Sequence, residues 1–94
     1  MKDSIKESLD RYAESGTPTG GFLRAVLEDK LMEAVTMADD ENVRDIVEIC
    51  RYVYNSLPYS CHGNPERVRA WMGHKGMEKF QVTMEQLLTG GKEA

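Results

Sequence analysis

Residues 21–58 decide the fold of this chain, and they read GFLRAVLEDKLMEAVTMADDENVRDIVEICRYVYNSLP. Apolar residues recur there every three or four positions, which is the period of an amphipathic helix. The first run predicts a helix over residues 22–38, and the second predicts a helix that is capped by Asp39 or Asp40 and ends before Pro58. Because so few residues separate the two helices, they are expected to form an antiparallel hairpin. The apolar positions are Phe22, Leu23, Val26, Leu27, Leu31, Val35, Ala38, Val43, Ile46, Val47, Cys50, Val53, Tyr54 and Leu57.

Shorter helices are predicted on both sides of this hairpin. An S-x-x-E capping box at residues 4–7 indicates a first helix that begins at Ser4 and stops at Gly16. The Asn-Pro pair at residues 64–65 is typical of a helix start, and Gly73 is expected to close the short helix that follows. These elements supply the additional apolar faces that the hairpin needs for a core.

The end of the chain predicts one more helix, from about residue 74 to residue 88, followed by a flexible polar tail from about residue 90. No strand alternation, internal repeat or low-complexity tract appears in the sequence. The chain is therefore predicted to be a single helical domain over residues 1–94. Its expected fold class is all-α, a small bundle of about four to five helices around the central antiparallel hairpin.

Charge is unevenly distributed along the sequence, although the formal net charge is -4. Residues 28–48 hold eight acidic residues against two basic ones, whereas residues 51–80 hold five basic residues against two acidic ones. The net negative charge of the chain argues against duplex nucleic acid as the partner, because neutralisation of phosphates by basic residues dominates the affinity of proteins for duplexes. The basic part is nevertheless able to attract an anion.

The composition is typical of an ordered, soluble protein from a reducing compartment. The longest unbroken apolar stretches are only two or three residues, far short of the roughly 20 needed to span a bilayer. Cys50 lies in a strongly periodic helix and no apolar signal segment is present at the N-terminus, so a reduced thiol is expected rather than a disulfide with Cys61. We expect a cytoplasmic protein that does not enter a membrane.

The glycine-rich run at residues 16–21 is the first candidate anion site. Its spacing is that of a phosphate loop, but apolar residues stand where that motif needs Lys and Ser or Thr, so nucleotide hydrolysis is not expected. Gly20 and Gly21 leave backbone amides unshielded at a helix start, and Arg24 lies one turn further along. This arrangement suits an anion. The competing interpretation is an interhelical turn in which the glycines only permit close packing.

A second candidate site surrounds the helix that begins at Asn64. Arg67 lies in its first turn with Trp71 just beyond, and the preceding loop contains Tyr59 and His62. Guanidinium groups beside aromatic rings hold phosphates and stack on bases. In the competing interpretation, Trp71 fills the core and the arginines are simply solvated.

The sequence contains no recognisable catalytic or metal-binding constellation. Cys61, His62 and His74 match no standard zinc spacing, and no fourth ligand is evident. The same residues lack the oxyanion donor and orienting acid that a thiol nucleophile requires. We therefore expect a protein that is not an enzyme and carries no metal or other cofactor.

Several segments resemble a widespread family of small phage and prophage proteins. The matching residues fall between about residues 12 and 76. The segments are GTPTGGFLRAVL at residues 16–27, Asp29-x-Leu31, the Tyr54-Asn55-x-x-Pro58 corner, and Cys61-x-Gly63-x-Pro65-Glu66-x-Val68 followed by Trp71.

The resemblance implies a link to phage sponges that bind cyclic nucleotide second messengers and so silence CBASS-type or Thoeris-type bacterial defence, because the family is identified as one that includes them. The resemblance implies a non-catalytic homo-oligomer that acts in the cytoplasm of the infected host. A cyclic dinucleotide presents phosphates and flat bases, so its binding requires anion donors and stacking surfaces. The candidate ligand-binding residues are Tyr12, Thr19, Gly20, Gly21, Arg24, Tyr59, Arg67 and Trp71.

A different class of function is also compatible with the sequence. A phage protein of this size can inhibit or regulate a host protein through direct protein–protein binding. The acidic stretch at residues 28–48 supports this alternative, because it complements a basic surface on a partner.

Overall fold

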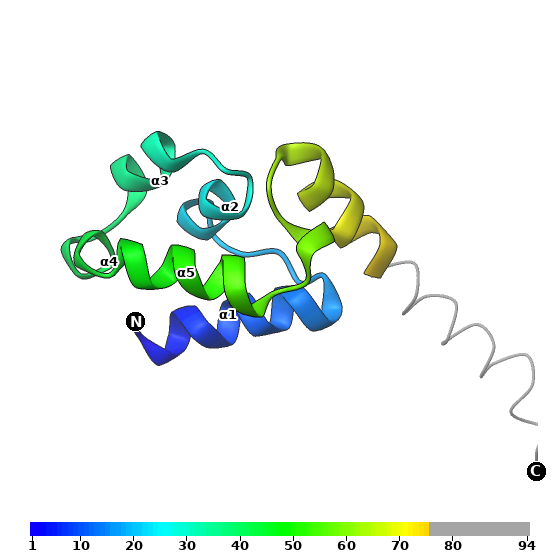
Figure 1. Cartoon of the computed structure of the whole chain (residues 1–94), viewed down its shortest axis with the longest axis horizontal. Helices are drawn as coiled ribbons and strands as arrows, with labels where there is room; N and C mark the ends of the chain where they lie inside the picture. The colour runs from blue at the N-terminus through cyan, green and yellow to red at the C-terminus, as the bar shows by residue number, and fades with distance from the viewer. Residues whose placement is uncertain (76–94) are drawn as a thin grey trace, which may run out of the picture.

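The computed structural model describes residues 1–75, and over that range the chain contains helices and no strand, which confirms the predicted all-α class (Figure 1). A further helix begins at residue 65 and is described as far as residue 75. The last helix and the polar tail expected from the sequence lie outside the described residues. The elements before residue 65 are α1 (Asp3–Ser15), α2 (Gly21–Leu27), α3 (Leu31–Met37), α4 (Asp40–Arg44), α5 (Ile46–Ser56) and the 3-10 helix η1 (Tyr59–Cys61).

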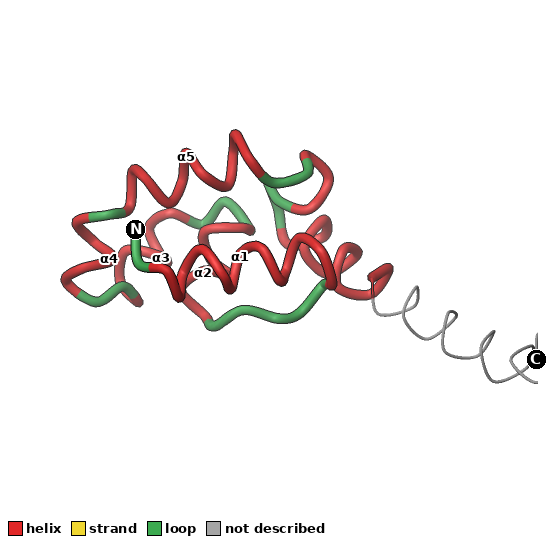
Figure 2. Tube along the Cα trace, turned by 90° about the horizontal axis from the view of Figure 1, so that it is seen from below, coloured by secondary structure: helices red, strands yellow, loops and turns green. Residues whose placement is uncertain are grey.

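Helix α1 runs along α5 and closes one side of the fold (Figure 1). The Tyr52 hydroxyl of α5 donates a hydrogen bond to the Asp10 carboxylate of α1. The N-terminal amine of Met1 donates to the Glu48 carboxylate near the start of α5. Seen from below in Figure 2, α1 lies in front of α2. Polar contacts thus align α1 with α5, while its apolar face points to the core.

The prediction of a single helix over residues 22–38 is wrong, because the helix is interrupted between α2 and α3. Asp29 adopts a left-handed conformation with a φ of 62°, which aspartate tolerates better than most residues. The buried Glu28 carboxylate accepts from Arg24 Nε at 2.7 Å and lies 3.3 Å from Lys30 Nζ. The break is therefore a charge-compensated turn, and α3 folds back against α2.

The second long helix of the expected hairpin is also divided, into α4 and α5, and the division falls at Asp45. Its predicted ends are confirmed. The Asp39 side chain caps α4 by accepting a hydrogen bond from the Asn42 backbone N–H at 2.7 Å. Helix α5 ends at Ser56, ahead of Pro58, which has no N–H to continue the helix. Four short helices thus replace the two long ones.

The outer helices also differ from the prediction at one end each. Helix α1 begins at Asp3 with no side-chain cap, so the capping box expected from Ser4 is not formed, whereas Gly16 ends the helix with a φ of 68° as predicted. Asn64 caps the following helix by accepting from the Arg67 backbone N–H at 2.8 Å. Gly73 does not close that helix, because residues 65–75 are continuously helical.

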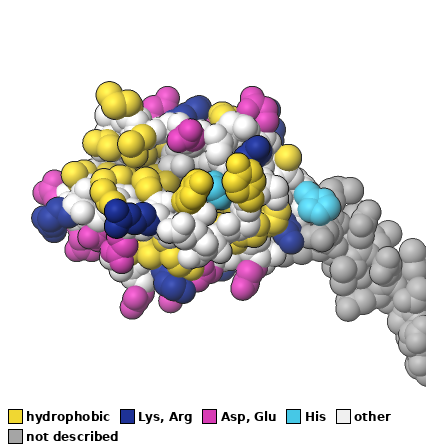
Figure 3. Space-filling model, viewed as in Figure 1, with side chains coloured by type: hydrophobic (Ala, Val, Ile, Leu, Met, Phe, Trp, Pro, Cys, Tyr) yellow, Lys and Arg dark blue, Asp and Glu magenta, His cyan; other side chains and the backbone are white. Residues whose placement is uncertain are grey.

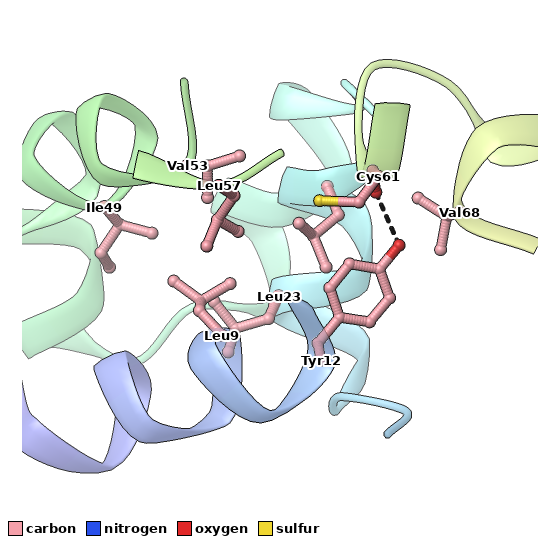
Figure 4. Packing of buried hydrophobic residues seen from close by; sticks show 9 residues of the cluster. Leu9, Tyr12, Leu23, Ile49, Val53, Leu57, Cys61 and Val68 are labelled. Atoms are coloured by element: carbon pink, nitrogen blue, oxygen red, sulfur yellow. Dashed lines mark hydrogen bonds between the residues drawn. The ribbon is translucent and has the colours of Figure 1, made fainter. Parts of the chain in front are cut away.

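The core lies where α1, α2, α5 and the helix from residue 65 converge (Figure 4). The Tyr12 ring is 1% exposed, and its hydroxyl donates to the backbone carbonyl of Cys61 at 2.6 Å. Trp71 Nε1 in turn donates to the backbone carbonyl of Tyr12 at 3.0 Å. These two bonds connect α1 to the chain after α5. The buried cluster consists of Leu9, Tyr12, Leu23, Leu27, Ile49, Val53, Leu57, Cys61 and Val68.

Replacing Tyr12 by phenylalanine should lower the free energy of unfolding by about 1–3 kcal/mol. The reason is that the change removes the only polar atom of the ring and leaves the buried Cys61 carbonyl without that donor. Urea denaturation followed by circular dichroism measures the difference. Tyr54→Phe is the matched control, because Tyr54 is 72% exposed, and we expect a change within about 0.5 kcal/mol. Equal stability of Tyr12→Phe and the parent would contradict this role.

Candidate ligand-binding cleft

A cleft of about 600 Å³ lies between α5, the turn after α2 and the segment that begins with η1. This volume is within the range of pockets that hold small molecules. Its apolar wall comes mainly from α5, with additions from α2 and α3. The residues of that wall are Val26, Leu31, Ile46, Val47 and Val53. The polar and aromatic residues are Asp29, Arg51, Tyr54, Asn55, Tyr59, His62 and Arg67.

Arg67 and Tyr59 form a cation–π pair in the lining of the cleft. The Arg67 guanidinium carbon lies 5.3 Å from the centroid of the Tyr59 ring, and Arg67 Nη1 donates to the His62 carbonyl at 3.3 Å. Gly63 makes this arrangement possible, because its φ of 119° is readily adopted only by glycine. Its N–H donates to the Leu27 carbonyl at 2.8 Å, which ties the loop to the end of α2. Local backbone geometry therefore places the guanidinium beside the ring.

His62 is nine-tenths buried in the wall of the cleft, beside this pair. Its ring centroid is 6.2 Å from that of Tyr59. Burial lowers the pKa of His62 and the nearby Arg67 guanidinium lowers it further, because both disfavour the imidazolium. We therefore describe His62 as a neutral imidazole at pH 7.

The two free cysteines do not have the properties of nucleophiles. Burial raises the pKa of the Cys61 thiol to about 11, and burial also raises the pKa of the Cys50 thiol, which lines the cleft. Both sulfurs are therefore protonated at neutral pH, and the thiolate is the reactive form. Within residues 1–75, no three His, Cys, Asp or Glu residues gather where they could hold a metal ion. In the same range, no helix has the length and apolar character to span a membrane.

Of the candidate residues named from the sequence, Tyr59 and Arg67 meet in the cleft and the other six lie outside its lining. Tyr12 is in the core, where its ring is not accessible to a ligand. Trp71 is half-buried, hydrogen-bonded to the Tyr12 backbone and covered by Lys75 Nζ at 4.9 Å from the ring centroid. The structure therefore assigns both rings mainly to packing.

The glycine-rich segment before α2 lies apart from the cleft. Gly20 is exposed and stands at the N-cap of α2, a helix of only seven residues. A Cβ on Gly21 would lie 3.2 Å from Met37 Sδ, which indicates close packing against α3. Arg24 pairs with Glu28, and the Thr19 hydroxyl donates to the neighbouring Gly20 carbonyl at 3.2 Å. An anion site at this helix start, shared with Arg67, stays a prediction.

Two residues of the cleft, Arg51 and Tyr54, were not identified from the sequence as ligand-binding residues. The helical period placed Tyr54 on the core stripe, but the side chain is 72% exposed. Arg51 lies one turn before it on α5, and both line the cleft. The available signal was this i, i+3 pairing of a guanidinium and an aromatic ring on one helix face.

The chain matches no protein-family model, no curated protein and no solved structure. The resemblance to small phage proteins therefore depends on the sequence segments quoted above, and the chemistry of the site depends on the cleft itself.

Proposed function

We propose that this chain is a phage-encoded, non-catalytic binding protein that sequesters a cyclic nucleotide second messenger and thereby blocks bacterial anti-phage immune signalling. The motif resemblance supports the biological setting, in the cytoplasm of the infected host. The cleft supports the chemistry, because it combines an apolar wall with cationic and aromatic groups.

The cation–π pair of Arg67 and Tyr59 carries this proposal. A guanidinium forms charge-assisted hydrogen bonds with phosphate, and an exposed tyrosine ring stacks on a base. Arg51 and Tyr54 repeat the same combination on α5, within the same cleft. Two cations and two rings correspond to the two phosphates and two bases of a cyclic dinucleotide. The Asp29 carboxylate in the cleft is suited to accept a hydrogen bond from a ribose hydroxyl or an exocyclic amine, rather than to contact a phosphate.

The direct test is thermal unfolding of the purified protein with a panel of cyclic di- and trinucleotides. A ligand at about 100 times its Kd adds about 2.7 kcal/mol to stability. For a domain of this size, the melting temperature should rise by roughly 10–20 °C. The messenger should then be recovered chemically intact after the protein is denatured. No stabilisation by any nucleotide would remove the support for this function, and recovery of a linearised product would show an enzyme.

We also propose that the protein acts as a homo-oligomer, and this is a separate prediction. Large apolar side chains are exposed on α3, α4 and the start of α5, where Figure 3 shows hydrophobic groups gathered on one face. A small chain that exposes such a face gains stability when another surface covers it. Light scattering at micromolar concentration should give a multiple of 10.6 kDa. A monomeric mass would contradict the prediction. The exposed residues are Leu31, Met32, Val35, Met37, Val43 and Val47.

The same face favours a second candidate function, direct binding and inhibition of a host protein. Met32 is 84% exposed on α3, and Glu33 and Asp40 are exposed beside the apolar residues of α3 and α4. An apolar surface edged with carboxylates suits a partner with an apolar patch edged by basic residues. The nucleotide panel separates the two functions, because an inhibitor that binds only protein gains no stability from any messenger.

A further inference from the structure

Asp29 places an unpaired carboxylate in the cleft. The residue is exposed and lines the cleft, and within residues 1–75 its carboxylate makes no ion pair and no hydrogen bond. Lys30, the next residue, pairs with Glu28 instead. Burial raises the pKa of the Cys50 thiol, and the charge of Asp29 raises it further, so the carboxylate lies near that thiol. Because Cys50 also lines the cleft, the Asp29 side chain faces the wall that α5 forms.

The turn between α2 and α3 does not need this carboxylate. The φ of 62° at Asp29 is a conformation that glycine adopts at lower cost and asparagine adopts readily. A second negative charge is also unfavourable beside the buried Glu28 carboxylate, which the neighbouring basic side chains already neutralise. Residues in such uncommon backbone conformations cluster at ligand-binding sites. These features favour a partner for the Asp29 carboxylate in the ligand rather than in the protein.

The chemistry of a carboxylate selects among the groups of a cyclic dinucleotide. An ionised carboxylate only accepts hydrogen bonds, so it repels phosphate and requires N–H or O–H donors. Guanine presents two adjacent donors on its Watson–Crick edge, N1–H and the 2-amino group, and these match the two carboxylate oxygens. Adenine presents one amino group beside the lone pair of N1, and uracil presents one N–H between two carbonyl oxygens. Guanine is therefore the base that pairs best with a carboxylate.

Tyr54 supplies a stacking surface close to the Asp29 carboxylate. It follows Cys50 by four residues, so the two side chains lie on the same face of α5, about 6 Å apart along the helix axis. The Tyr54 ring is 72% exposed, and both residues line the cleft. A base that stacks on Tyr54 is thus about one helical turn from the thiol that Asp29 approaches.

We propose that Asp29 makes the cleft selective for guanine, by accepting hydrogen bonds from N1–H and the 2-amino group of a guanine that stacks on Tyr54. This inference rests on the proposed function and goes beyond it, because it names the base and assigns its recognition to one side chain. The cleft is then divided by chemistry. Arg51 and Arg67 bind phosphate whatever the base is, whereas Asp29 distinguishes guanine from adenine and uracil.

Calorimetric titration of the full chain with cyclic di-GMP, cyclic di-AMP and cyclic di-UMP tests the assignment. The parent should bind cyclic di-GMP most tightly. Asp29→Asn replaces one acceptor oxygen by an amino group that opposes the guanine donors, so the Kd of cyclic di-GMP should rise by about ten- to a hundredfold. The Kd values of the other two probes should change by less than about threefold. Asparagine tolerates the φ of 62°, so this variant should fold as the parent does.

Asp40→Asn is the matched control for the loss of charge. Asp40 is exposed in the first turn of α4 and does not line the cleft, so the change removes the same charge away from the site. Its three Kd values should change together by less than about threefold, because salt screens the charge at a distance. Asp29→Gly is the second test variant. It removes the acceptor and suits the backbone, so its melting temperature without nucleotide should stay close to that of the parent while the preference for guanine is lost.

The titrations separate failure of this inference from failure of the proposed function. A parent that does not prefer cyclic di-GMP among the three probes would contradict guanine selectivity, and the proposed function would stand if any nucleotide of the wider panel stabilised the protein. An equal loss for all probes in Asp29→Asn would assign the carboxylate to a ribose hydroxyl. An equal gain would show only that its charge repels phosphate, and either result overturns the inference. If the parent binds no probe and gains no stability from any nucleotide, the proposed function itself fails.

Discussion

Replacing Arg67 by alanine should weaken binding of the cyclic nucleotide by roughly ten- to a hundredfold, which corresponds to about 1.5–3 kcal/mol. The Arg67 guanidinium carbon lies 5.3 Å from the centroid of the Tyr59 ring in the lining of the cleft. In the proposed complex, its remaining N–H groups donate to a phosphate. Folding should change little, because the side chain is exposed and its one described hydrogen bond, to the His62 carbonyl, is long at 3.3 Å. Calorimetric titration with the stabilising nucleotide measures the loss.

Two other arginines serve as controls for this result. Arg69 is exposed on the same helix but does not line the cleft, so Arg69→Ala should bind as the parent does. Arg24→Ala tests the helix-start site expected from the sequence. It also removes a partner of the buried Glu28 carboxylate, so its stability must be measured alongside its affinity. Normal binding by Arg67→Ala together with loss of binding by a folded Arg24→Ala would move the site to the start of α2.

Replacing Gly16 by alanine should destabilise the protein by roughly 2–4 kcal/mol. Gly16 has a φ of 68°, which is unfavourable for a residue with a side chain. Its Cβ would also lie 2.6 Å from Lys75 Cβ and 3.3 Å from the Met72 backbone. The helix at residues 65–75 would have to move away from the end of α1. Urea denaturation should show the change as a lower midpoint with a similar slope.

Gly20→Ala is the matched control for Gly16→Ala. Gly20 has a φ of -68°, and a Cβ there would meet nothing within 4 Å. Its stability should change by no more than about 0.5 kcal/mol. Equal stability of the two variants would contradict the close packing of the helix at residues 65–75 against Gly16. Loss of nucleotide binding by a stable, bulkier substitution at Gly20 would instead support the anion site at α2.

The sequence predicted the helical class and several helix ends because those depend on local chemistry. Gly16, Asp39 and Asn64 act at the ends where glycine and side-chain caps were expected. The break at Asp29 was missed because the apolar period continues through it. Leu31 and Val35 keep that period, yet both are exposed, so the pattern could not show which stripe enters the core.

The candidate site was predicted only in part for a similar reason. Tyr59 and Arg67 are close in sequence and flank a loop with glycine and an N-cap residue, so local reasoning brought them together. Arg51 and Tyr54 join them only because the chain folds α5 against the loop after η1. Tyr12 was expected to bind the ligand, and only its hydrogen bond to the Cys61 carbonyl shows why the core needs it.

Two hydrogen bonds hold the loop that carries Tyr59 and His62, one of them with α1 and the other with α2. Tyr12 Oη of α1 donates to the Cys61 carbonyl, and the Gly63 N–H donates to the Leu27 carbonyl of α2. Such a loop is preorganised, because its backbone need not lose further conformational entropy when a ligand arrives. Differences in affinity among related binding proteins arise mostly from the dissociation rate. These two hydrogen bonds therefore favour a long residence time for a ligand in the cleft, which is the kinetic property that the proposed sequestration requires.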